Sequence, residues 1–238
     1  AGAAKALRNP NLSVRYKAWT ALQAMQEKAR PALTKMAADE NPRLRARALW
    51  ALAAIKDGAQ KAIEMALKDK GDNLRALALR IARRHGMPIE PLVRRLVSEK
   101  SALVRRECAV SLHRVATPEA AELWAELALQ HDGKDRWYLE ALGIGEKGNE
   151  TACFNAWLNK VGDAWKAPAG RDLVWRSRAP EAAGLLVKLV LDSKVPESEH
   201  PRFMRALDFH SGKAKEDALA TLLLNLDAPA EPKDKPAP

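Results

Sequence analysis

The sequence predicts an all-α protein in which pairs of helices stack into an α-solenoid. The first indication is a 30-residue spacing between four dipeptides of an apolar residue and arginine, Val14-Arg15, Leu44-Arg45, Leu74-Arg75 and Val104-Arg105. The second is a small residue three positions after each arginine, namely Ala18, Ala48, Ala78 and Cys108. A repeat of roughly 20 to 50 residues with helix-type patterns is typical of stacked helical arrays.

In the first half of the chain, the sequence predicts regular repeats over residues 9–116, each with an outer helix and an arginine-bearing inner helix. Residues 1–8 are expected to be the end of a preceding helix. Inner helices are expected where apolar residues recur at helical spacing, over 11–25, 43–55, from Gly71-Asp72 to about Arg84, and 102–115. Outer helices are expected to start at Pro31, after Gly58 and over 89–98, since proline is tolerated in a first helical turn.

The second half, residues 117–226, predicts irregular repeats. Thr117-Pro118-Glu119 is a helix start with Thr as the cap, and a partner helix is expected near Asp135. Further helices are expected over 150–161, 180–192, 200–209 and 213–226, with a long turn over 162–170. Residues 1–226 would then form one solenoid of about seven helix pairs. Residues 227–238 contain four prolines and are expected to be a disordered tail or a linker.

Each repeated arginine follows an acid or an amide by six positions. The pairs are Asn9 with Arg15, Asp39 with Arg45, Asp69 with Arg75, and Glu99 with Arg105. We expect each arginine to reach this residue in its own turn or in the equivalent turn next door, which would build a ladder of charge-assisted hydrogen bonds between repeats. Looser matches are Arg136, Arg171 and Arg202. The ladder residues are therefore assigned to architecture and not to a ligand site.

The recurring Asn or Asp with Arg, in paired helices of this length, resembles the HEAT-repeat family, particularly its short bacterial type. The resemblance covers residues 9 to about 226. It implies a right-handed solenoid whose inner helices line a concave surface used mostly for protein contacts. Because unrelated activities share such folds, function has to be argued from particular surfaces.

A narrower resemblance involves residues 132–179, in the segments Asp132-Gly-Lys-Asp-Arg-Trp-Tyr-Leu-Glu-Ala-Leu-Gly-Ile-Gly145, Trp157-Leu-Asn-Lys-Val-Gly and Ala169-Gly-Arg-Asp-Leu-Val-Trp-Arg-Ser-Arg-Ala179. They resemble the helical-repeat region of large planctomycete-type proteins, between a sugar-dehydrogenase-like propeller and a cytochrome c module. The resemblance implies a connector in an extracytoplasmic redox protein, periplasmic or secreted. The chain has no Cys-x-x-Cys-His haem motif, so no cofactor is expected.

Charge is divided unevenly along the chain. Residues 1–116 contain 24 Lys and Arg against 10 Asp and Glu, whereas residues 117–238 contain 16 against 20. An anionic partner is therefore expected at the N-terminal repeats. Arginines off the apolar stripes of the inner helices predict a basic concave face, consisting of Arg43, Arg47, Arg80, Arg83, Arg84, Arg106 and Arg114. The competing interpretation is a solvated surface without a ligand.

Other candidate residues give weaker indications. Trp137, Trp165 and Trp175 are predicted either to fill gaps between irregular repeats or to line a groove for a partner. The five histidines are scattered singly, so no metal site is expected, and Cys108 and Cys153 are expected to be free thiols in the core.

The function predicted from these features is a non-catalytic scaffold for protein or interdomain contacts. We expect a monomer without a membrane-spanning segment, whose partner is another protein or a neighbouring domain of a longer chain. The alternative is a nucleic-acid-binding protein that resembles the helical-repeat DNA glycosylases. In that case the basic face would bind phosphates, and Asp72 or Glu107 would take the place of the catalytic acid.

Overall fold

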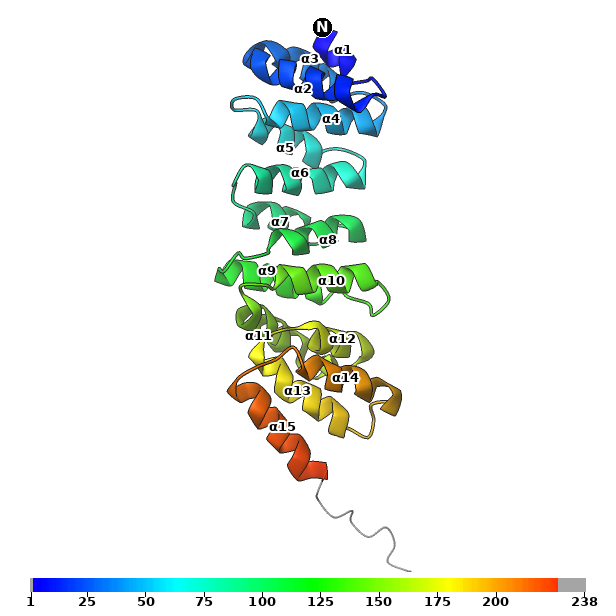
Figure 1. The fold of residues 1–238 in the computed structure, drawn as a ribbon, viewed down its shortest axis with the longest axis vertical. Coiled ribbons are helices and arrows are strands. Elements are labelled where there is room, and N and C mark those ends of the chain that lie inside the picture. Colours follow the sequence, from blue (N-terminus) through cyan, green and yellow to red (C-terminus); the bar gives the residue numbers. More distant parts are fainter. Residues whose placement is uncertain (1, 227–238) are drawn as a thin grey trace, which may run out of the picture. The chain divides into compact units, whose positions relative to one another are not determined.

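The structure, a computed structural model, describes residues 2–226 and divides the chain into two compact units, Ala1–His113 and Arg114–Pro238. Every regular element in the described part is a helix, which confirms the all-α prediction of helices packed in neighbouring pairs (Figure 1). The predicted tail, 227–238, lies outside the described residues. Within residues 2–226, no helix combines the length and the apolar content that crossing a membrane requires.

The N-terminal unit has two layers of helices. The inner layer is formed by helices that each contact the next: α2 (Leu12–Met25), α4 (Pro42–Ala53), α6 (Asp72–Arg84) and α8 (Ala102–Ser111). The outer helices α3 (Arg30–Met36), α5 (Ala59–Leu67) and α7 (Glu90–Leu96) pack against this layer. A short helix, α1 (Gly2–Ala6), packs on α2 and α3, and a 3₁₀ turn, η1 (Gln26–Ala29), joins α2 to α3.

The C-terminal unit repeats the two-layer plan. Its outer layer consists of α9 (Pro118–Ala128), α11 (Glu150–Val161), α13 (Pro180–Leu191) and α15 (Lys213–Leu226). Its inner layer consists of α10 (Arg136–Gly145), α12 (Pro168–Arg176) and α14 (His200–Leu207), with α12 in contact with both others. Two 3₁₀ segments, η2 (Gly162–Lys166) and η3 (Glu197–Glu199), precede α12 and α14.

Local chemistry explains why the helices begin where they do. The side chains of Asn11 and Asn41 accept hydrogen bonds from the first-turn N–H groups of α2 and α4. Thr117 and Asp135 do the same for α9 and α10, at the two starts that the sequence predicts in this region. Each cap satisfies a backbone donor that the helix cannot satisfy itself.

The small residues of the repeat are where the inner helices pack most tightly. Ala18, Ala48, Ala78 and Cys108 are all buried, the last three completely. Leu44, Leu74 and Val104 before the arginines are buried too, whereas Val14 on the first inner helix is 37% exposed. Cys108 and Cys153 are buried free thiols, as the sequence predicts. The 30-residue period therefore marks the core of the N-terminal unit.

Two predicted boundaries are wrong. The inner helix expected over 102–115 ends at Ser111, because the next N–H groups bond three residues back and Arg114 then takes a positive φ of 61°. The N–H of Arg114 instead donates to the carbonyl oxygen of Lys147. The long turn expected over 162–170 is largely helical, since η2 runs into α12 at Pro168.

Gly58, the cap of α5, is a position where a side chain cannot fit. A Cβ atom there would lie 1.8 Å from the carbonyl oxygen of Leu52 and 3.0 Å from that of Ile55. Backbone carbonyl groups cannot rotate away as a flexible side chain can. We therefore expect Gly58→Ala to lower the free energy of unfolding by about 1 to 3 kcal/mol. Chemical denaturation followed by circular dichroism measures this change.

Gly184 on α13 is the matched control, because nothing lies within 4 Å of the Cβ it would gain. Gly184→Ala should raise the free energy of unfolding by roughly 0.5 to 1 kcal/mol, the usual gain in a helix interior. Equal stability of wild type and Gly58→Ala would contradict the packing described for this turn.

Candidate functional site

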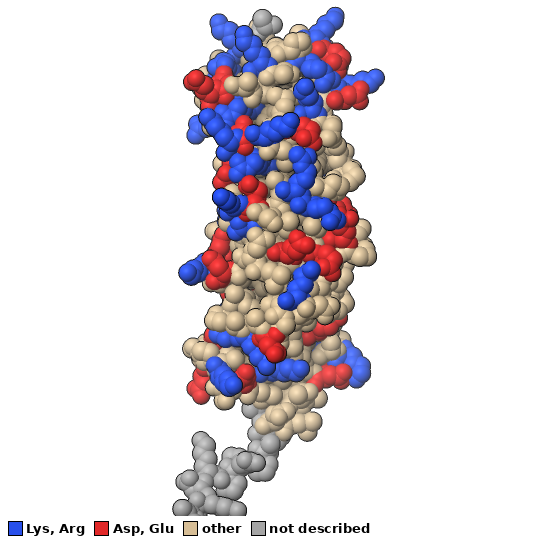
Figure 2. Space-filling model, turned by 180° about the vertical axis from the view of Figure 1, so that it is seen from behind, with Lys and Arg blue, Asp and Glu red and all other residues tan. Residues whose placement is uncertain are grey.

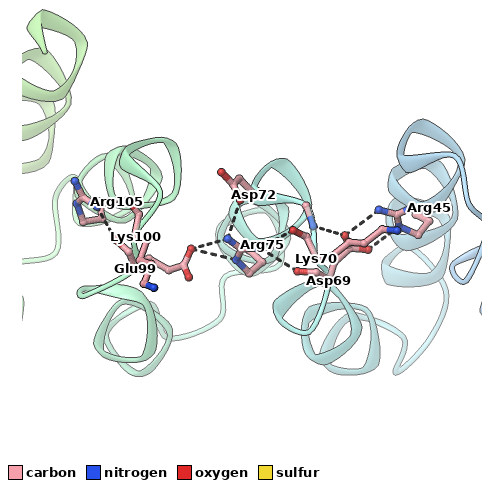
Figure 3. Close-up of polar contacts among 9 residues, drawn as sticks. Arg45, Asp69, Lys70, Asp72, Arg75, Glu99, Lys100 and Arg105 are labelled. Atoms are coloured by element: carbon pink, nitrogen blue, oxygen red, sulfur yellow. Dashed lines mark hydrogen bonds and ion pairs between the residues drawn. The ribbon is translucent and has the colours of Figure 1, made fainter.

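The repeated arginines of the N-terminal unit bind within the stack (Figure 3). Arg45 Nη1 donates to the carbonyl oxygens of Asp39 and Glu40 at 3.0 and 2.9 Å, and its Nε and Nη2 donate to the Asp69 carboxylate at 2.6 and 3.0 Å. Arg45 thus joins the backbone of its own turn to the acid of the next turn along the chain.

Arg75 repeats this arrangement one helix pair further along. Its Nη1 donates to the carbonyl oxygens of Asp69 and Lys70 at 3.1 Å each, and its Nη2 donates to Glu99 at 2.7 Å. A further bond from Nη2 reaches the Asp72 carboxylate at 2.8 Å. The ladder therefore runs through three successive turns, with the arginine side chain as the rung.

Three of the acid or amide residues that precede the arginines also form hydrogen bonds within their own turns, which spacing in the sequence does not reveal. The side-chain oxygens of Asn9, Asp39 and Asp69 accept a hydrogen bond from the backbone N–H two residues later. This bond forms an Asx turn, which orients the chain into the next helix. The turn therefore restricts the residue type at these positions, in addition to any contact with an arginine.

The two ends of the ladder differ from its middle. Arg15 and Arg105 each donate through Nη1 to the two carbonyl oxygens of their own turns, at 2.5 to 3.0 Å. Asp39, the acid next door to Arg15, is bound by Arg8 instead. Carbonyl contacts are therefore common to all four arginines, and Arg45 and Arg75 add contacts to the carboxylate of the next turn.

In the less regular repeats of the C-terminal unit, one arginine makes the same two kinds of contact, to a carbonyl group of its own turn and to an acid of the next turn. Arg171 is buried, donates to the carbonyl oxygen of Lys166 at 2.9 Å and binds both oxygens of Glu199 at 2.5 and 3.1 Å. Arg202 binds Asp172 and Glu199. Arg136 does not match the pattern, because it lies at the exposed start of α10 and pairs with Glu140 on its own helix.

Burial strengthens the ladder electrostatically. The side chains of Arg45 and Asp69 are 8% and 10% exposed. Burial works to raise the pKa of Asp69, but the bonds from Arg45 and from the Gly71 N–H outweigh it, so that the pKa is lowered. The Asp69 hydrogen bond in turn raises the pKa of Arg45. Both groups are therefore charged throughout the physiological pH range.

The predicted basic face is only partly available to a ligand. Arg80 and Arg83 on α6 bind the Glu107 carboxylate of α8, with Arg80 Nε and Arg83 Nη2 at 2.8 and 2.7 Å from its oxygens. Arg47 is half-buried and donates to the carbonyl oxygen of Leu7 at 2.8 Å. Burial and the nearby charges of other arginines lower the pKa of Arg47. These three guanidinium groups therefore already have partners inside the unit.

The remaining members of the predicted face have different positions. Arg43 and Arg84 are exposed on α4 and α6, and Arg106 is half-buried on α8. Arg114 was expected on an inner helix, but it follows the end of α8. In the view of Figure 2, Lys and Arg side chains are spread over the N-terminal unit, with acidic side chains among them. Three members of the predicted face thus have partners inside the unit, and Arg43 and Arg84 are exposed.

Asp72 and Glu107 are poorly placed for a catalytic acid. Glu107 is 8% exposed and is held by two arginines. Asp72 binds Ser101 and Arg75, which together lower its pKa. A general acid or base needs a free proton position near its substrate. Among residues 2–226, no group of His, Cys, Asp and Glu side chains is arranged to hold a metal ion.

The three predicted groove tryptophans have separate environments. Trp137 is 73% exposed on α10. Trp175 on α12 is half-buried, and the guanidinium carbon of Arg136 lies 4.8 Å from its ring centroid. Trp165 lies in η2, with Lys166 Nζ over its ring and Gly170 against its backbone. Arg136 therefore contacts Trp175, Trp137 follows Arg136 on the exposed start of α10, and Trp165 lies in the turn before α12.

A buried acid, which was not predicted from the sequence, lies at the end of α10. Glu146 is 1% exposed and accepts hydrogen bonds from Ser177 Oγ and the Arg178 N–H at 3.0 and 3.1 Å. Burial raises its pKa to about 7, although both hydrogen bonds oppose the shift. The separation of 31 residues between Glu146 and Ser177 is close to the repeat length, and this is the signal that would have paired them.

Stacked helix pairs joined by inward-facing arginine rungs define an α-helical repeat protein. Residues 1–70 match the family model for HEAT repeats, which supports the resemblance to that family. HEAT repeats are generally scaffolds for protein interactions and are typically non-catalytic. A comparison with curated proteins found no match. The narrower resemblance of residues 132–179 stays a prediction.

Proposed function

We propose that this chain is a non-catalytic scaffold that binds another protein, or a neighbouring domain of a longer chain, through its inner helices. The observation that carries the proposal is the arginine ladder, because it assigns the chain's most regular charged residues to holding helix pairs together. What remains for a partner is the exposed surface of those helices. Such surfaces are the usual binding faces of stacked repeats.

Photo-cross-linking in the source cells tests the proposal. A photoreactive amino acid replaces Arg84 on α6 or Trp137 on α10, both exposed on inner helices. Matched controls replace Lys61 on α5 and Lys188 on α13, which are exposed on outer helices. We expect adducts with the same protein from an inner position and not from the outer ones, and binding of that purified protein to the full chain.

Adducts from the outer positions alone, or none from the inner ones, would count against the scaffold. Reproducible turnover of a substrate by the purified chain would also count against it. Size-exclusion chromatography with light scattering, run on the same samples, tests the proposed monomer.

A finer version of the proposal makes the chain a connector in an extracytoplasmic redox protein. Its support is the resemblance of residues 132–179 to such connectors. The gene decides this version: the reading frame should continue into a dehydrogenase-like propeller or a cytochrome c module. An isolated frame without these neighbours would remove it and leave the scaffold in place.

The second candidate function is nucleic-acid binding, which the charge balance of residues 1–116 favours. The exposed Arg43 and Arg84 support it, whereas the engagement of Arg80 and Arg83 by Glu107 weakens it. Binding to a DNA duplex should then fall by orders of magnitude between low and moderate salt. An absence of duplex binding at low salt would exclude this candidate.

A further inference from the structure

Helices α10 and α12 of the C-terminal unit, together with the segments that follow α12 and α14, carry arginine and aromatic side chains, which we call the arginine–aromatic surface. It consists of Arg136, Trp137, Trp175, Arg176, Arg178 and Phe209. Trp137 and Phe209 are 73% and 59% exposed. Tryptophan and arginine are the residues that most often dominate binding energy at protein interfaces.

Two of these arginines share one carboxylate. Arg136 Nη2 and Arg176 Nε lie 2.5 and 2.9 Å from the two oxygens of Glu140. One negative charge thus faces two positive ones. Arg136 also lies over the ring of Trp175 on α12, with its guanidinium carbon 4.8 Å from the ring centroid, which is a cation–π contact.

Gly143 makes this arrangement fit. A Cβ atom on Gly143 would lie 2.2 Å from the guanidinium carbon of Arg176, so the Arg176 side chain rests on bare backbone of α10. A glycine within a helix costs stability relative to alanine. Its presence here is explained by the space that Arg176 needs in order to reach Glu140.

Arg178 adds a third positive charge. Its Nη1 donates to the carbonyl oxygens of Trp175, Arg176 and Ser177 at 2.9 to 3.3 Å, and its guanidinium lies over the ring of Phe209. Within residues 2–226 it has no carboxylate at salt-bridge distance. Burial and the positive charge of Arg176 lower its pKa, and the charges of Glu146 and Glu140 oppose this shift.

We infer that the arginine–aromatic surface binds an acidic linear peptide segment of another protein, with carboxylates on the guanidinium groups and an apolar side chain on Trp137. The inference rests on the proposed scaffold function and names the chemistry of its partner. The local excess of guanidinium groups over carboxylates favours an acidic partner. Residues 117–238 as a whole contain 20 Asp and Glu against 16 Lys and Arg, so this local positive charge fits a short acidic segment better than a long polyanion such as a nucleic acid.

Fluorescence anisotropy with the full chain tests the inference. The probes are a fluorescein-labelled library of short peptides that combine Glu and Asp with Leu and Pro, the same library with Lys in place of the acids, and single-stranded oligo-dT. We expect saturable binding of the acidic library at low salt and weaker binding of the lysine library. Tighter binding of oligo-dT, or equal binding of both libraries, would overturn the inference.

Two variants locate the binding site. Trp137→Ala should weaken binding of the acidic library by about tenfold or more, as expected for an aromatic anchor. Gly143→Ala should also weaken it, because the new Cβ displaces Arg176, while the helical signal and the melting temperature stay near wild type. The matched control is Leu224→Ala on α15, which is exposed to a similar extent, 76%, and should leave binding unchanged.

The outcomes separate this inference from the scaffold itself. Failure of the acidic library to bind, together with cross-links from position 84, would overturn the inference and leave the scaffold function standing. Failure of the library together with an absence of inner-face cross-links would overturn both. Weakening by Leu224→Ala as strong as that by Trp137→Ala would place the binding elsewhere and overturn the inference.

Discussion

Replacing Arg45 with methionine is expected to lower the free energy of unfolding by about 3 to 5 kcal/mol, the usual cost of leaving one partner of a buried ion pair uncompensated. Methionine keeps much of the apolar stem but loses four hydrogen bonds, two to backbone carbonyls and two to Asp69. Asp69 would keep only its bond from the Gly71 N–H. Urea denaturation followed by circular dichroism measures the change.

Arg95→Met is the matched control for this prediction. Arg95 also forms an ion pair between helices, with Glu64 at 3.0 Å, but the two side chains are 50% and 38% exposed. Exposed pairs contribute little, so this variant should lose less than about 1 kcal/mol. Hydrogen exchange should localise the effect of Arg45→Met to helices α4 to α6. Equal losses for the two variants would show that burial of the ladder does not matter.

Glu146→Gln is expected to make the C-terminal unit more stable than wild type above neutral pH. Because burial raises the folded-state pKa of Glu146 from an ordinary 4.5 to about 7, its contribution is fully present below pH 4.5 and is lost as the pH rises through 7. The full loss amounts to roughly 3 kcal/mol. Glutamine stays neutral, can donate to Ser177 and can accept from the Arg178 N–H, so it should avoid this loss.

Denaturation midpoints between pH 4 and pH 8.5 test the prediction. Wild type should lose stability between pH 4.5 and 7, and Glu146→Gln should show a smaller loss over that window. Glu140→Gln is the control, because the Arg176 bond lowers the pKa of Glu140 despite its burial, and its stabilising contribution is lost only below the ordinary value. A wild-type profile that is flat from pH 4.5 to 7 would contradict the burial of an ionisable Glu146.

The fold could be predicted from the sequence largely because the repeat places the same kinds of side chain at fixed intervals. Arg45 and Arg75 recur with small residues after them and acids before them, and this regularity predicts stacked pairs. The backbone carbonyl contacts of the arginines could not be predicted, since every residue has a carbonyl group. The end of α8 was also missed, because a non-glycine residue with positive φ, here Arg114, has no reliable signature in sequence.

The candidate surfaces were harder to predict than the fold. Arg80 and Arg83 look like free charges on an inner helix until Glu107, 27 and 24 residues further along, is placed beside them. Gly143 gives a clearer signal in retrospect, since a glycine inside a helical pattern often marks a close approach of another group. Pairing of residues about one repeat apart is the signal that would have found both contacts.

The repeated arginines hold the helix pairs of the N-terminal unit together. A double-mutant cycle on Arg45 and Asp69 tests this role directly, using Arg45→Met, Asp69→Asn and the double variant, with free energies of unfolding from urea denaturation. Asparagine keeps the acceptor for the Gly71 N–H, so the cycle isolates the ion pair. The account predicts a coupling energy of about 1.5 to 3 kcal/mol. A coupling energy near zero would contradict it.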